Sequence, residues 1–221
     1  MKVFIILSIF CAAAFAEDYC YKDARRACGT KLSLDMKNCT AKYGAIERAE
    51  ASLQKFAYHH FIRSFDYLLL STHFANYQKN RPGFEKLFRD LSDNKWHEGI
   101  ELIKYITSRG GEMQFNDVDN LVESEDGNFD LHEITAIAKA LDIEKKMANE
   151  ASEIHHRIWH KSVLHDPEIT DYIEKEFVHK EKDLIRKLAG YSTDLKDLLN
   201  PEDGSLSLFL FDEFLQGNKL F

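Results

Sequence analysis

Five ionisable side chains interrupt apolar runs of this sequence at positions that a helix would turn towards its buried face. They are His60, Lys95, Glu98, Glu144 and Glu181. Each stands three or four residues from a large or small apolar neighbour, which is the spacing of one helix face. Burying such a group without a partner costs several kcal/mol. The five groups must therefore pair with one another, bind a metal ion, or mark a site that has lost its chemistry.

The elements that carry these groups are four long helices, predicted from apolar residues that recur every three or four positions. The first covers about 45–76, and the second runs from Pro82 to the glycine pair at 110–111, which fits a left-handed cap. The third carries an apolar stripe over 131–158. The fourth begins at Asp166–Pro167 and ends before Asn200–Pro201.

Two connections define the architecture. The stretch 112–128 is long enough to cross the length of a bundle, so the second and third helices should be parallel. A short fifth helix at 205–216 is apolar on several faces, and we expect it to pack against other subunits. The sequence therefore predicts an all-α fold, a four-helix bundle with a long crossover and a short fifth helix, which is the ferritin-like arrangement.

Composition excludes several classes of protein. The chain has 221 residues, a formal net charge of -8 and 30% charged residues, so we expect neither a nucleic-acid binder nor a membrane-spanning protein. Residues 1–16 have a basic start, an apolar run and a small-x-small end, which is the pattern of a secretory signal peptide cleaved after Ala16. We expect a cysteine-bearing extension at 17–44 and the bundle with its fifth helix at 45–217.

The extension carries three cysteines and a glycosylation motif. Cys20, Cys28 and Cys39 cannot all pair within one chain, and we expect a disulfide between subunits. The alternative is one internal bridge and a buried free thiol. Asn38 begins the N-glycosylation motif Asn-Cys-Thr, which gains weight because the chain is expected to enter the secretory pathway.

Several longer motifs resemble ferritins over residues 45–217. They are YITSRGG at 105–111, QFNDV at 114–118, ALDIEK at 140–145, DP at 166–167 and LFLFD at 208–212. The cysteines, signal peptide and glycosylation motif make the chain similar to the secreted ferritins of insects. This resemblance implies a hollow shell of 24 subunits that takes up Fe(II) and holds a ferric mineral.

The resemblance also implies a role for each of the buried ionisable positions. In the catalytic ferritin subunit, carboxylates, a Glu-x-x-His pair, a tyrosine and a glutamine form a di-iron ferroxidase centre. The first carboxylate falls on His60, the tyrosine on Tyr67 and the bridging carboxylate on Lys95. An ammonium in the bridging position repels the metal ions instead of binding them.

The remaining positions of that centre are also changed. The histidine of the pair falls on Glu98, the third-helix glutamate on Glu144 and the glutamine on Glu181. Lysine in the bridging position and glutamate in the glutamine position resemble the ferritin light chain, so we expect a buried salt-bridge layer. The alternative is a rearranged di-iron site in which His60, Glu98, Glu144 and Glu181 bind iron.

These expectations combine into one functional hypothesis. The chain is a light-chain-like subunit for iron storage and transport, not itself an enzyme, in a secreted, disulfide-linked hetero-24-mer whose ferritin heavy-chain partner oxidises iron. By resemblance, Asp171 and Glu174 match the acidic residues of the pore through which iron enters; a solvated acidic face is the alternative. Glu144 and Glu181 are weak candidates for metal ligands. A ferritin-like scaffold with no iron role is the third hypothesis.

Overall fold

The computed structural model describes residues 20–29, 36–115, 131–160, 165–199, 204–218 and 220. Contacts divide the chain into two units, Met1–Ala41 and Lys42–Phe221. In the first unit, helix α1 spans Cys20–Gly29. The predicted signal peptide and its cleavage position lie outside the described residues, so the proposed boundaries at residues 16 and 44 stay predictions.

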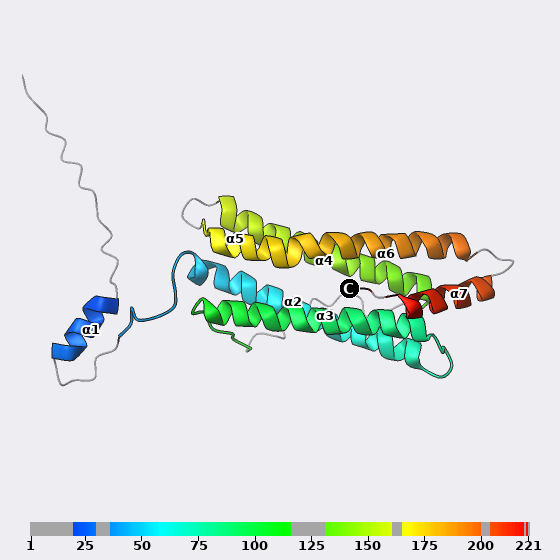
Figure 1. Cartoon of the computed structure of the whole chain (residues 1–221), viewed down its shortest axis with the longest axis horizontal. Helices are drawn as coiled ribbons and strands as arrows, with labels where there is room; N and C mark the ends of the chain where they lie inside the picture. Colours follow the sequence, from blue (N-terminus) through cyan, green and yellow to red (C-terminus); the bar gives the residue numbers. More distant parts are fainter. Residues whose placement is uncertain are drawn as a thin grey trace, which may run out of the picture. The chain divides into compact units, whose positions relative to one another are not determined.

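The second unit is the predicted four-helix bundle. Its members are α2 (Ile46–Ala75), α3 (Pro82–Ser108), α4 (Glu133–His160), and a fourth helix built from α5 (Pro167–Ile173), a π-helical segment (Glu174–Val178) and α6 (His179–Leu198). Helix α2 packs along α3, and α4 packs along α6 (Figure 1). The predicted fold class is confirmed.

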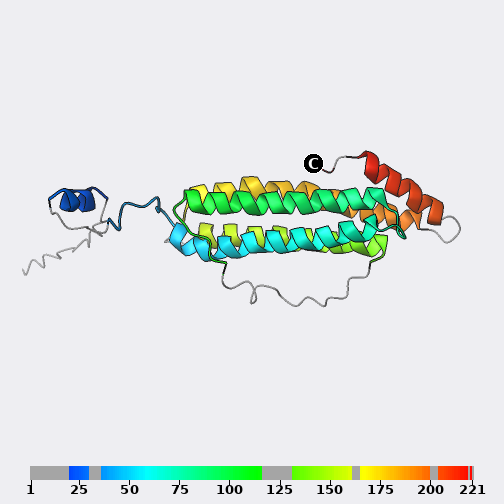
Figure 2. The same ribbon diagram turned by 90° about the horizontal axis from the view of Figure 1, so that it is seen from below.

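The directions of the helices confirm that the second and third long helices are parallel. Figure 2 shows that α3 and α4 run the same way along the bundle, whereas α2 and the fourth helix run the opposite way. Residues 116–130, which make up most of the predicted crossing connection, lie outside the described part of the chain. Gly110 has a φ of 81°, so the left-handed cap predicted after the second helix is also confirmed.

The core lies between the four helices, as the apolar stripes indicate. In α4 the buried side chains include Ile137, Ala151 and Ile158, which lie in the range of the predicted stripe. Glu144 lies on the same buried face, since it is 0% exposed.

The π-helical segment is a feature that the periodicity did not predict. Ile169, Ile173, Phe177 and Glu181 are each four residues apart, and all are buried. Four-residue steps drift around a regular α-helix of 3.6 residues per turn, but a wider π turn restores the phase. This segment keeps Phe177 and Glu181 on the inward face.

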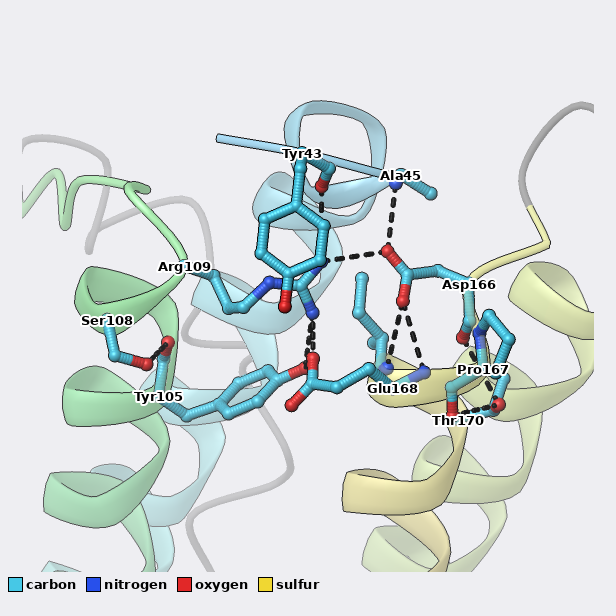
Figure 3. A network of polar contacts seen from close by, with 10 residues as sticks. Tyr43, Ala45, Tyr105, Ser108, Arg109, Asp166, Pro167, Glu168 and Thr170 are labelled. Carbon is cyan, nitrogen blue, oxygen red and sulfur yellow. Dashed lines mark hydrogen bonds and ion pairs between the residues drawn. The ribbon is translucent and has the colours of Figure 1, made fainter. Parts of the chain in front are cut away.

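Arg109 ties together three elements at one end of the bundle (Figure 3). Its Nη2 donates to the Tyr43 carbonyl at 3.1 Å and to Asp166 Oδ2 at 2.9 Å, and its Nη1 contacts Glu168. The guanidinium lies 4.0 Å from the centre of the Tyr43 ring. Asp166 also accepts from the Ala45 N–H and caps the first turn of α5. This network fixes the start of α2 and of α5 against the end of α3.

Helix α7 (Gly204–Gly217) packs on the start of α3. Asp212 Oδ1 accepts from the Phe84 N–H at 3.0 Å, and the backbones approach so closely that a Cβ on Gly83 would lie 1.9 Å from the Asp212 carbonyl oxygen. The outer face of α7 stays exposed in one chain, with Leu206 and Leu210 more than half exposed. Its packing against other subunits stays a prediction. No described helix is long and apolar enough to cross a membrane.

Candidate functional site

The five ionisable groups singled out from the sequence meet in one buried layer at the middle of the bundle. His60 comes from α2, Lys95 and Glu98 from α3, Glu144 from α4, and Glu181 from α6. None of them is more than 9% exposed. Because all four long helices contribute, the layer exists only in the folded bundle.

The ammonium of Lys95 lies at the centre of this layer. Its Nζ is 2.6 Å from Glu181 Oε1, 2.8 Å from Glu144 Oε2 and 3.0 Å from Glu98 Oε2. Burial on its own would lower the pKa of this ammonium, but the three carboxylates outweigh burial and raise its pKa well above the usual value. Lys95 is therefore a fixed positive charge at any physiological pH.

The pKa values of the two carboxyl groups that face Lys95 from α4 and α6 are shifted in opposite directions. Burial opposes the charge of Glu144, yet Lys95 and a 2.6 Å hydrogen bond from the Tyr67 hydroxyl lower its pKa. For Glu181, burial and the neighbouring Glu144 charge exceed the attraction of Lys95 and raise its pKa well above the usual value. The surroundings therefore favour the charged form of Glu144 and disfavour the charged form of Glu181.

His60 completes the layer as a neutral imidazole. Its Nδ1 lies 2.8 Å from the Phe56 carbonyl oxygen, which can only accept, so this nitrogen carries the proton. Its Nε2 has no hydrogen-bond partner and lies 3.6 Å from Glu98 Oε2. Burial and the Lys95 charge lower the pKa of His60 to about 4. The lone pair of Nε2 is therefore available inside the layer.

The carboxylates of this layer, which could serve as metal ligands, contact the Lys95 ammonium instead. Carboxylates and an imidazole suit iron, and Tyr67 lies beside them as the resemblance implied. However, the ammonium of Lys95 occupies the point at which the three carboxylates of the layer converge. Within the described ranges, no group of three or more His, Cys, Asp or Glu side chains is placed to hold a metal ion.

A cleft of about 240 Å³ reaches the layer between α3 and α6. Lys95, Glu98 and Glu181 line it, together with Asn94 and Leu220. Asn94 donates to Glu98 Oε1 at 2.9 Å, a contact that its spacing of four residues from Glu98 could have indicated. Leu220 carries no such signal in the sequence, because it lies beyond the last predicted helix.

The acidic pair expected at a pore lies apart from the layer, on the surface. Asp171 is held by Lys175 at 2.7 Å. Glu174 lies between two imidazoles, with Oε2 3.7 Å from His155 Nε2 and Oε1 3.5 Å from His179 Nε2. Both carboxylates are more than half exposed. Their role in a pore stays a prediction.

Two of the three cysteines pair with each other. Cys20 and Cys39 form a disulfide within the chain, a pairing that the sequence left open, and the expected disulfide between subunits is not tested by this bond. Helix α1 and the turn at Met36–Cys39 bring the two residues together, and Asp23 of α1 accepts from the Asn38 N–H at 3.0 Å. The side chain of Cys28 lies outside the described residues, so pairing between subunits stays a prediction for that cysteine.

Comparisons with known proteins agree with this geometry. The family described as Ferritin: Ferritin-like domain matches residues 50–198. Proteins named ferritin light chain are similar over almost the full length: that of Drosophila melanogaster is 39% identical over 98% of this chain and 99% of its own, and that of Trichoplusia ni is 42% identical over 96% and 97%. The crystal structure of Trichoplusia ni secreted ferritin superposes with a TM-score of 0.84 at 42% identity, over 91% of this chain and 100% of that one.

Proposed function

Since this chain belongs to the ferritin-like family, we propose that it is a light-chain-like ferritin subunit that helps to build an iron-storing shell without oxidising iron itself. The observation that carries the proposal is the position of Lys95, whose Nζ lies within 3.0 Å of three carboxylates. The names of the similar proteins support the same assignment.

A ferroxidase centre must hold iron ions on carboxylates and leave positions open for oxygen. The ammonium neutralises the carboxylates that would bind those ions and repels any cation at the same point. It also stabilises the bundle, because it compensates buried negative charge in the way that metal ions would. In this subunit, a salt-bridge layer takes the structural place of a metal centre.

The proposed assembly follows from the missing chemistry. A shell built from this chain alone would lack an oxidation centre, so a ferritin heavy-chain subunit supplies it in a hetero-24-mer. Asp171 and Glu174 line the pore through which Fe(II) reaches the interior, and the ferric mineral is the cargo. The assembly is secreted, and Cys28 is the cysteine left to link subunits, because Cys20 and Cys39 pair with each other.

One observation favours a second function, a ferroxidase with a rearranged di-iron site. His60 Nε2 has no hydrogen-bond partner and lies 3.6 Å from Glu98 Oε2. If Lys95 moved into the adjoining cleft, then His60, Glu98, Glu144 and Glu181 would be left as potential iron ligands.

Aerobic Fe(II) oxidation separates the two functions. The shell assembled from this chain alone is compared with the same chain coassembled with the heavy-chain partner. A background rate for the chain alone, and saturable oxidation after coassembly, supports the light-chain role. Saturable oxidation by the chain alone refutes it and makes the rearranged site the working assignment.

A matched set of variants tests the part played by Lys95. Lys95→Glu combined with Glu98→His and His60→Glu restores the family's ligand types, so it should raise the oxidation rate of the chain alone. Lys104→Glu in the same helix is the control, because Lys104 is exposed and pairs with Glu101 across one turn, away from the buried layer. An equal gain in both variants would contradict the assignment.

A further inference from the structure

The glycosylation motif spans the end of the disulfide-closed loop of the first unit. Cys39, the middle residue of the motif Asn38-Cys39-Thr40, is bonded to Cys20 of α1. The acceptor residue Asn38 therefore adjoins a covalent link to that helix. This juxtaposition raises the question of whether the motif can be modified once the bridge has formed.

Asn38 is held by a second residue of the same helix. Its side-chain Nδ2 and its backbone N–H both donate to Asp23 Oδ2, each at 3.0 Å. Asp23 is only 8% exposed, and α1 fixes its position. The turn that leads to the motif is closed by a 3.0 Å hydrogen bond from the Cys39 N–H to the Met36 carbonyl. The amide nitrogen that would accept a sugar is therefore already donating within the loop.

Sugar transfer has requirements that this arrangement opposes. The Asn Nδ2 forms a bond to C1 of the sugar while the bond from C1 to a lipid-linked diphosphate breaks, and Nδ2 releases one proton. The nitrogen lone pair is delocalised into the amide carbonyl, so the amide must twist before that nitrogen can attack. A side chain pinned by Asp23 beside a closed bridge is restrained from this twist.

We propose that Asn38 accepts an N-linked oligosaccharide only while the Cys20–Cys39 bridge is open, so that bridge closure ends the period in which the site can be modified. Closure transfers two electrons and two protons from the two thiols to a donor disulfide, which becomes a dithiol. The proposal rests on the proposed function in one respect, since both reactions require passage through the secretory pathway.

Occupancy of Asn38 in the full chain, expressed in secretory eukaryotic cells, tests this order of events. Peptide N-glycosidase converts a glycosylated Asn38 to aspartate, and mass spectrometry of the peptide gives the occupied fraction. Cys20→Ser and Cys39→Ser each open the bridge and leave an intact motif, so both should raise this fraction above that of the wild-type chain. Thr40→Ala, which destroys the motif, sets the zero.

Cys28→Ser is the matched control, because it removes a thiol from the same helix without removing either half of the bridge. Its occupancy should equal that of the wild-type chain. Unchanged occupancy in both bridge-opening variants would overturn the proposal. The mass of the mature N-terminus is read in parallel: a cleaved leader without the expected change overturns this proposal alone, whereas an uncleaved leader overturns the secretory assignment with it.

Discussion

Lys95→Met tests the energetic role of the central ammonium. The substitution keeps an unbranched apolar stem of similar length and removes the charge that lies 2.6 to 3.0 Å from three carboxylates. At an effective dielectric constant of about 20, one ionised carboxylate at 2.8 Å attracts the ammonium by about 6 kcal/mol. Because desolvation of the ammonium offsets part of this attraction, we expect the free energy of unfolding to fall by about 3–5 kcal/mol.

The pH dependence of this loss gives a sharper test than its size. In the wild-type chain the pKa of Glu144 is lowered, so its contribution to stability is present above the usual carboxyl pKa and is lost as the pH falls. Without Lys95, burial raises that pKa, and the sign reverses. The loss should therefore be smaller at pH 5 than at pH 8, as measured by urea unfolding of the assembled chain.

Two further variants make the Lys95 prediction falsifiable. Lys104→Met removes an exposed lysine whose side chain is 65% accessible, and it should leave the unfolding midpoint unchanged. Adding Glu144→Gln and Glu181→Gln to Lys95→Met should recover part of the loss, since of the three carboxylates only Glu98 then faces the vacated position. A loss of equal size at both pH values, or no recovery in the triple variant, would refute the electrostatic explanation.

Three other changes test single contacts of the bundle. Tyr67→Phe removes the 2.6 Å hydrogen bond to the α4 carboxylate and should lower the free energy of unfolding by about 1.5–3 kcal/mol. Gly83→Ala forces a methyl group against the backbone of α7 and should cost about 1–3 kcal/mol, whereas Gly190→Ala, in open space in α6, should stabilise by about 0.5–1 kcal/mol. Burial opposes the charge of Asp166, but hydrogen bonds, including one from Arg109, lower its pKa. The stability that this carboxylate contributes is therefore lost as the pH falls below about 4. In Asp166→Asn, the melting temperature should accordingly fall less steeply with pH in this acidic range.

The bundle could be predicted because the residues that form the buried face of each helix can be recognised from the sequence of that helix alone. The recurrence of apolar residues and the cap at Gly110 depend on neighbours within one or two turns, and the structure bears them out. The π-helical segment at Glu174–Val178 could not be predicted in this way, since its sequence resembles an ordinary helix. The wider turn is stabilised by packing against the other helices, because it keeps Phe177 and Glu181 on the inward face.

The site was predictable in its members and not in its internal arrangement. Spacing along each helix placed Lys95, Glu144 and Glu181 on inward faces, and the structure brings them together. The direction in which the pKa of each carboxyl group is shifted depends on distances between helices. The sequence of a single helix does not determine those distances. The same reason applies to the cysteines. Counting thiols left both internal and intersubunit pairing open, and the contacts of the Met36–Cys39 turn with α1 bring Cys20 and Cys39 together.

The cleft beside the layer bears on whether the subunit could still oxidise iron. Lys95 lines this cleft, so its side chain has room to leave the carboxylates and free four potential ligands. Leaving costs the same interactions that Lys95→Met removes, about 3–5 kcal/mol, so the open form is populated at roughly one part in 10² to 10⁴. Because iron can bind only this open form, its apparent affinity for the layer is lower than its intrinsic affinity by the same factor. A lysine that can leave the layer therefore weakens a ferroxidase even where it does not abolish one. The proposed division of labour with a heavy chain is consistent with the contacts that hold Lys95 between three carboxyl groups.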